Sequence, residues 1–150
     1  MLTQPQREPD GRIVAGVDGS LASKTALAWA IRQAKLTGAV VEAVIAWHHP
    51  ASYGYPVTVP DDSDYSELAA KVVADAIAEV AGPAGPVEIR SKVIEGNAAA
   101  VLLAASADAE LLVVGSRGHG GFVEALLGSV SQHCVHHAAC PVVITRDSNG

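Results

Sequence analysis

Short apolar runs alternate with helix-like segments along almost the whole chain, and this alternation most constrains the fold. The apolar runs of strand length span residues 12–17, 39–47, 86–96, 110–116 and 140–146. The segments between them that have helical character span residues 21–38, 66–82, 97–109 and 129–139. Strands that alternate with helices of about ten residues or more predict a parallel sheet, with right-handed crossovers and helices on both faces.

The length of 150 residues favours one domain that spans residues 1–150. Apolar residues make up 49% of the chain and charged residues 17%, a balance that supports a packed core rather than intrinsic disorder. We expect residues 1–10 and 147–150 to be flexible tails. The connection at residues 48–62 is long and rich in proline, which is typical of lids, binding loops or disordered segments.

The charge balance and hydropathy argue against nucleic acid and membrane as partners. The formal net charge is -6, whereas non-specific nucleic-acid binding needs clustered Lys and Arg. Aromatic residues are only 4% of the chain, too few for a base-stacking platform. No apolar run approaches the roughly 18 residues of a membrane span, and the first residues lack the apolar centre of a signal peptide. We therefore expect a cytoplasmic protein.

Two strand ends carry the residues that look functional. Residues 16–20 read GVDGS, and residues 113–121 read VVGSRGHGG. In open parallel sheets, ligands bind beyond the carboxyl ends of the strands, where the strand order reverses. If the first and fourth strands are neighbours, both loops face one crevice.

The glycines after the fourth strand suggest a phosphate cradle. Gly115 and Gly118 allow close approach of a ligand to the backbone, and Gly128 with Ser129 stands where the last helix begins. The first N–H groups of a helix have no intrahelical partner and favour an anion. One alternative stays open, because Ser129 followed by Gln132 is also a capping-box pattern in which Ser129 only caps the helix.

Other familiar sites are absent or weakly indicated. The chain has neither a GxxxxGK[ST] loop nor a GxGxxG fingerprint. The helical spacing of His133, His136 and His137 suits a metal, but no HExxH glutamate accompanies it, so ordinary helix residues are favoured. His119 lies in the glycine loop, where it can face phosphates. Two further residues, Cys134 and Cys140, are read as small buried hydrophobes rather than a disulfide.

The spacing Gly115-x2-Gly118-x9-Gly128-Ser129 resembles the G-x2-G-x9-G-(S/T) signature of the nucleotide-binding branch of the universal stress protein family. The resemblance extends over residues 12–30, 93–106 and 111–146. It implies a Rossmann-like, three-layer sandwich with five parallel strands in the order 3-2-1-4-5. It also implies that ATP lies in the crevice between strands 1 and 4.

Carried over by position, the resemblance implies a set of binding residues. The residues that would contact ribose and phosphates are Gly115, Gly118, Gly128 and Ser129, with a backbone N–H from Val130. Asp18 would bind the ribose or a divalent cation such as Mg²⁺. Ala46 would offer backbone groups to adenine, Val17 would form part of the pocket wall, and Arg117 would add a cation.

These features predict an ATP-binding regulatory protein of the stress response. The alternatives are a sensor of cyclic AMP or another adenine nucleotide, and an enzyme on the same fold such as a slow ATPase. The sequence favours a regulator over an enzyme, because Asp18 is the one carboxylate that can be placed near the phosphates. We also expect a homodimer through the apolar last strand and a regulatory protein partner whose identity the sequence does not show.

Overall fold

A computed structural model describes residues 10–48, 62–82, 87–116 and 128–146. Strands and helices alternate along these residues in the order β1 (Asp10–Gly16), α1 (Leu21–Thr37), β2 (Val40–Trp47), α2 (Asp62–Ala81), β3 (Ile89–Glu95), α3 (Ala98–Ala105), β4 (Ala109–Gly115), α4 (Ser129–His137) and β5 (Val142–Thr145). The strands form one sheet in the order β3-β2-β1-β4-β5, and every neighbouring pair is parallel. The predicted fold class and strand order are confirmed.

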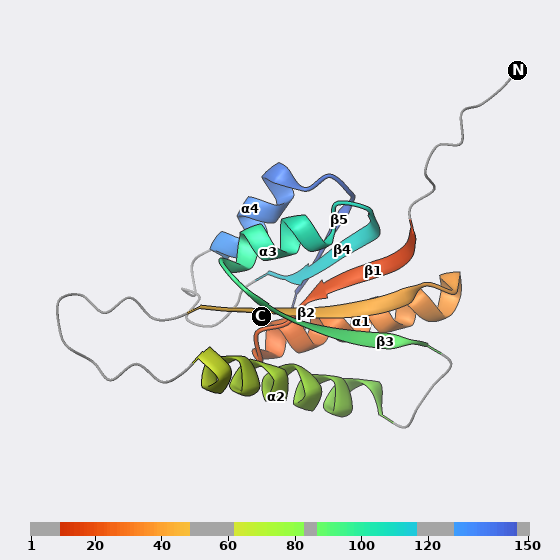
Figure 1. Cartoon of the computed structure of the whole chain (residues 1–150). Coiled ribbons are helices and arrows are strands. Elements are labelled where there is room, and N and C mark those ends of the chain that lie inside the picture. The colour runs from red at the N-terminus through yellow and green to blue at the C-terminus, as the bar shows by residue number, and fades with distance from the viewer. Residues whose placement is uncertain (1–9, 49–61, 83–86, 117–127, 147–150) are drawn as a thin grey trace, which may run out of the picture.

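The helices cover the sheet in two layers. Helices α1 and α2 lie against one face, and α3 and α4 lie against the other (Figure 1). This arrangement follows from right-handed crossovers, because the chain moves outward from β1 in one direction and returns across the sheet through α3 before it continues to β5. The strand order reverses between β1 and β4, so the carboxyl ends of these two central strands flank the switch point.

The alternation of side chains along β1 divides the core between the two faces. Ile13, Ala15 and Val17 pack with α1 and α2, whereas Val14 packs with residues of α3 and α4. Ile13, Val14 and Ala15 have no exposed surface. A strand buried on both faces reads as a nearly continuous apolar run, which is how residues 12–17 appear in the sequence.

Helix α1 has clear signals at both ends. The Ser20 side chain accepts a hydrogen bond from the Ser23 N–H and caps the first turn. At the other end, Gly38 adopts a left-handed conformation with φ of 80°, and its N–H donates to the Ala34 carbonyl. Four residues separate the end of β1 from the helix, whose first turn therefore lies at the switch point.

Helix α2 begins earlier than the sequence pattern predicts. Its first residue is Asp62 rather than Ser66, so the connection from β2 is shorter than expected. The helix therefore includes part of the polar stretch that precedes its apolar face. Among the helices that the structure describes, none has the length and apolarity needed to cross a membrane.

Candidate functional site

The loop after β1 is fixed by a small hydrogen-bond network. The Ser20 N–H donates to Asp18 Oδ1 at 2.8 Å, and the Asp18 N–H donates to Ser23 Oγ at 3.2 Å. Gly19 between them has φ of 84°, a conformation that side chains disfavour. Ser23 is buried, whereas Asp18 is exposed. The network therefore holds the Asp18 carboxylate at the surface, directly beyond the carboxyl end of β1.

The end of β4 and the start of α4 are joined by two short hydrogen bonds. The Gly128 N–H donates to the Ser116 carbonyl at 2.6 Å, and Ser131 Oγ donates to the Gly115 carbonyl at 2.5 Å. Ser131 is buried, with 3% of its surface exposed. These contacts bring Gly115 and Gly128, which are distant in the proposed motif, to one place at the switch point.

Gly128, not Ser129, is the N-cap of α4. Gly128 has φ of -70° and ψ of 165°, and no side chain caps the helix. Its carbonyl accepts from the Gln132 N–H, so Ser129 is already the first helical residue. The capping-box interpretation of Ser129 is therefore wrong, because the extended conformation that a cap requires belongs to the preceding residue.

The absence of a side-chain cap leaves backbone donors at the start of α4. Within the described part of the chain, the N–H groups of Ser129, Val130 and Ser131 have no hydrogen-bond acceptor. They precede the first intrahelical bond, and together with the helix dipole they favour a negative charge at this point. The donors lie beside the end of β4, at the switch point of the sheet. The glycine spacing predicted a phosphate site in this region.

Gly115 has a packing role that is separate from any ligand. A Cβ on Gly115 would lie 2.7 Å from the Ala22 carbonyl oxygen and 2.9 Å from the Ala22 Cβ. Real Cβ atoms do not approach backbone this closely, so helix α1 can reach the end of β4 only because residue 115 is glycine. The first turn of α1 thus adjoins both the β1 loop and the β4 end.

The other predicted site residues are placed as follows. Val17 is 5% exposed and lies in the core under α1, where its N–H donates to the Val44 carbonyl at 2.8 Å. Ala46 is half-buried near the carboxyl end of β2. Arg117, Gly118 and His119 lie outside the described residues. The structure thus brings together Asp18, Gly115, Gly128, Ser129 and Val130 around the ends of β1 and β4.

The histidines of α4 form a surface cluster. The rings of His133 and His137 have centroids 4.6 Å apart, and those of His136 and His137 lie 6.4 Å apart. All three residues are exposed. Across residues 10–48, 62–82, 87–116 and 128–146, no group of three or more His, Cys, Asp and Glu side chains could hold a metal.

Both cysteines are free thiols. Burial raises the pKa of the Cys134 thiol above its ordinary value of 9.0, and the nearby Cys140 raises it further. Burial also raises the pKa of Cys140, although a hydrogen bond from the Ser106 side chain and the charge of Arg12 oppose that shift. Thiols with raised pKa values are poor nucleophiles. The interpretation as a small buried hydrophobe holds for Cys134, whereas Cys140 is only partly buried.

Sequence reasoning missed three hydroxyl residues at this end of the sheet. Ser23 holds the β1 loop, Ser131 bonds the end of β4, and Thr145 at the end of β5 has a buried Oγ1 atom without a partner in the described structure. Serines in a first helical turn are a signal for such contacts, but they are common enough that the signal does not select these residues.

A model of the universal stress protein family matches residues 11–146. This match covers every strand and helix described above except Asp10, the first residue of β1. The chain belongs to the universal stress protein family. A curated universal stress protein of Mycolicibacterium smegmatis is 37% identical over an alignment of 146 residues that covers 89% of this chain and 47% of that protein. The chain spans about half the length of the curated relatives that it matches.

Solved universal stress proteins share the fold. The UspA protein of Lactobacillus plantarum superposes with a TM-score of 0.73 at 24% identity, over 90% of this chain and 97% of the other. A universal stress protein in complex with cAMP has a TM-score of 0.60 at 23% identity, over 91% and 97% of the two chains. A family member from Arabidopsis thaliana with AMP bound has a TM-score of 0.54 at 19% identity, over 92% and 93%.

Proposed function

We propose that this universal stress protein binds ATP in the crevice between the carboxyl ends of β1 and β4, and that the bound nucleotide regulates a protein partner of the stress response in the cytoplasm. The observation that carries the proposal is the uncapped start of α4 beside the end of β4. Its amides at Ser129, Val130 and Ser131 are donors for phosphate oxygens. The structural neighbours with cAMP and AMP support an adenine nucleotide as ligand.

The remaining parts of the nucleotide would be held by the two flanking strands. Gly115 and Gly118 would let the backbone approach the ribose and phosphates, and Arg117 would supply a cation. Ala46, near the end of β2, would offer backbone groups to adenine. Val17 is buried beneath the β1 loop, so its contribution is to the floor of the pocket.

A divalent cation fits this arrangement through Asp18. Mg²⁺ in phosphate sites is held by one or two carboxylates, phosphate oxygens and several waters. Asp18 is an exposed carboxylate at the end of β1, held in place by the Ser20 N–H on Oδ1. It would hold Mg²⁺ against the phosphates. The metal would reduce the repulsion among the phosphates and the repulsion between the phosphates and the acidic chain.

The test removes one backbone donor without disturbing the helix. Proline is tolerated at the first position of a helix, and the residue before it must be extended, as Gly128 is. Ser129→Pro therefore removes an N–H from the site, whereas the control Ser129→Ala removes only the hydroxyl. Isothermal titration should show about tenfold weaker ATP binding in Ser129→Pro and a smaller change in Ser129→Ala.

Mass spectrometry of the denatured protein should identify the nucleotide that copurifies. If no nucleotide copurifies and neither ATP, AMP nor cyclic AMP raises the unfolding temperature, the proposal is wrong. Cyclic AMP is the second candidate ligand because of the neighbour in complex with it. Competition titrations between ATP and cyclic AMP decide between the two, since the tighter ligand displaces the other.

We also propose a homodimer that forms through β5. This strand is the edge of the sheet next to β4, and its sequence VVIT is apolar. An apolar edge offers unpaired backbone groups to a second copy. Sedimentation of the purified protein should give the mass of a dimer. The substitution Val143→Lys should reduce the sedimenting mass to that of a monomer. A monomer at high micromolar concentration would contradict this proposal.

A further inference from the structure

A hollow on the α3 side of the sheet lies away from the proposed nucleotide crevice. It has a volume of about 600 Å³, within the range of small-molecule sites, and its lining includes Arg12, Glu42, Arg90, Lys92, Ile94 and Ala105. We call this the basic hollow. Arg12 stands near the start of β1, whereas Gly115 and the loop after β1 stand at the carboxyl ends of their strands. The basic hollow is therefore distinct from the switch point.

Strand register explains why these side chains share a face. Glu42 of β2 is paired with Val14 of β1 on one side and with Arg90 of β3 on the other. Lys92 lies two residues further along β3, opposite Val44. Because Val14 and Val44 pack on the α3 side, their cross-strand neighbours Glu42, Arg90 and Lys92 emerge on that side too.

Helix α3 is too short to cover this part of the sheet. It has 8 residues, and Leu102 packs against Gly16 near the carboxyl end of β1. Its last residue, Ala105, forms one wall of the basic hollow and receives a hydrogen bond on its carbonyl from Arg12 Nη1 at 2.9 Å. The charged residues of β2 and β3 therefore lie beyond the end of the helix.

The lining carries three cations and one carboxylate. Arg12 Nη1 donates to Glu42 Oε1 at 3.1 Å, and both side chains are largely buried, with 18% and 8% exposed. Arg90 donates to Glu88 through Nε at 2.6 Å, which leaves its two Nη groups for another acceptor. Lys92 is exposed and has no ion-pair partner in the described residues.

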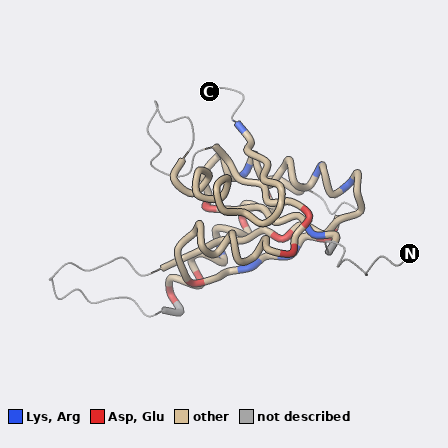
Figure 2. Tube along the Cα trace, turned by 90° about the horizontal axis from the view of Figure 1, so that it is seen from above, with Lys and Arg blue, Asp and Glu red and all other residues tan. Residues whose placement is uncertain are grey.

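This local excess of positive charge is the reverse of the chain as a whole, whose formal net charge is -6. Seen from above, basic positions lie among acidic ones on the strands rather than over one broad basic face (Figure 2). The positive surface of the basic hollow is therefore limited to three cations, an extent that suits a small ligand and not a nucleic acid. Guanidinium groups also match the geometry of carboxylate and phosphate oxygens.

We propose that the basic hollow binds a small dianion that carries phosphate or carboxylate groups. One anionic group would be held by the Nη groups of Arg90 and the other by the Lys92 ammonium. Arg12 is fixed by Glu42 and the Ala105 carbonyl, so this ion pair forms a preorganised polar base of the site. Ile94 offers apolar contact for the carbon skeleton between the two groups.

The test is a titration of isotope-labelled protein followed through its backbone amide resonances. The probes are inorganic phosphate and succinate, which distinguish a phosphate ligand from a dicarboxylate. We expect saturable shifts at the amides of Arg12, Arg90 and Lys92, with a Kd on the order of 1 mM or tighter. The binding should weaken as salt is raised, because the cations are partly exposed.

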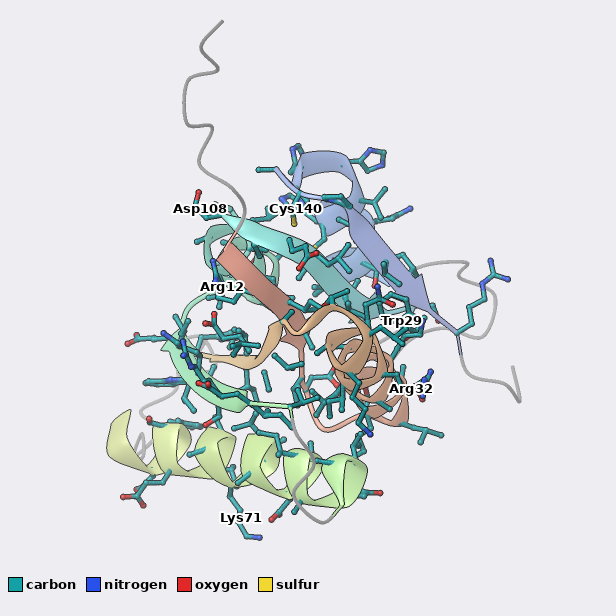
Figure 3. All side chains as sticks on the ribbon, turned by 90° about the vertical axis from the view of Figure 1, so that its right-hand side faces the viewer. Arg12, Trp29, Arg32, Lys71, Asp108 and Cys140 are labelled. Carbon is teal, nitrogen blue, oxygen red and sulfur yellow. The ribbon has the colours of Figure 1, made fainter. Side chains whose placement is uncertain are left out.

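The variant is Lys92→Gln, and the matched control is Lys71→Gln. Both remove one exposed lysine, but Lys71 projects from α2 on the opposite side of the sheet from Arg12 (Figure 3). Lys92→Gln should weaken dianion binding about five- to tenfold, whereas Lys71→Gln should leave it unchanged. ATP binding at the switch point should be the same in both variants.

Three outcomes would overturn the proposal. One is the absence of saturable shifts at the basic hollow with either probe. Another is an equal loss of affinity in Lys92→Gln and Lys71→Gln, which would mean that the anions respond only to net charge. Shifts confined to the amides of Gly128, Ser129 and Val130 would also count against it, because they would place the anion in the proposed nucleotide crevice.

Discussion

The backbone of Ala22 lies where a side chain of residue 115 would begin. A Cβ on Gly115 would meet the Ala22 carbonyl oxygen at 2.7 Å. This relationship presses the first turn of α1 against the end of β4, and it accounts for glycine at position 115 without reference to a ligand. The same glycine also belongs to the proposed phosphate motif, so folding and binding place demands on one residue.

Gly115→Ala is expected to lower the free energy of unfolding by about 1–3 kcal/mol, because the contact is with backbone that cannot move aside cheaply. Denaturant unfolding measures the effect. Gly11→Ala is the control, since an added Cβ there meets nothing within 4 Å and the change should stay within about 0.5 kcal/mol. Equal stability of the two variants would show that α1 adjusts to the methyl group.

The Arg12–Glu42 ion pair should be strongly coupled in folding. Its side chains are largely buried, and removal of one partner leaves the other without its charge partner, at a cost of about 2–4 kcal/mol. A double-mutant cycle with Arg12→Ala and Glu42→Ala should give a coupling of about 1 kcal/mol or more. The exposed Lys71–Asp75 pair provides the comparison and should give about 0.5 kcal/mol or less.

Thr145→Val is expected to stabilise the protein. The Thr145 Oγ1 atom is buried without a hydrogen-bond partner in the described structure, so replacement of the hydroxyl by a methyl group removes a desolvation cost of about 1 kcal/mol. Thermal unfolding measures the gain. In the control Thr25→Val, the hydroxyl already donates to the Leu21 carbonyl, and no gain is expected. A loss of stability in Thr145→Val would mean that the hydroxyl does have a partner.

The two cysteines should differ in reactivity. Cys134 has no exposed surface and Cys140 is partly exposed, so iodoacetamide should modify Cys140 first. Both pKa values are raised, which lowers the thiolate fraction at neutral pH, so both should react more slowly than in the unfolded chain. Mass spectrometry after timed quenching follows the order, and faster modification of Cys134 would contradict the burial.

The raised pKa of Cys134 also predicts alkaline sensitivity. The folded chain holds this thiol neutral, whereas the unfolded chain releases its proton near the ordinary value of 9.0. The stabilisation is therefore complete below that pH and is lost as the pH rises through the folded pKa. Unfolding midpoints of Cys134→Ala and the parent protein, compared between neutral pH and about pH 10, should converge at the higher pH.

The order of elements and strands could be predicted because it depends on features that a sequence displays directly. Residues 12–17 and 110–116 are short, largely apolar runs that indicate strands buried on both faces, and the family resemblance adds the strand order. Local chemistry near helix ends was harder to predict. The Ser129–Gln132 pattern suggests a capping box, but the residue before it already has the conformation of the cap.

The basic hollow could not be predicted for a different reason. Arg90 and Lys92 alternate along β3 in the sequence, yet their meeting with Arg12 and Glu42 depends on the register between three strands. Register is set by long-range packing, because a slip by one residue would move each side chain to the other face. It also depends on where α3 ends, which the sequence places at residue 109 and the structure places at Ala105.

The two outer strands of the sheet differ in a way that limits growth. At one end, β3 presents Arg90 and Lys92 to solvent, and charges of this kind discourage pairing with another strand. At the other end, β5 is short and apolar. A sheet with an apolar edge at β5 and a charged edge at β3 can pair with a second copy through β5, but the two β3 edges of that pair disfavour a third copy. The charges on β3 therefore limit the extension of the sheet. Pairing through β5 would stop at a closed dimer instead of continuing into a fibre.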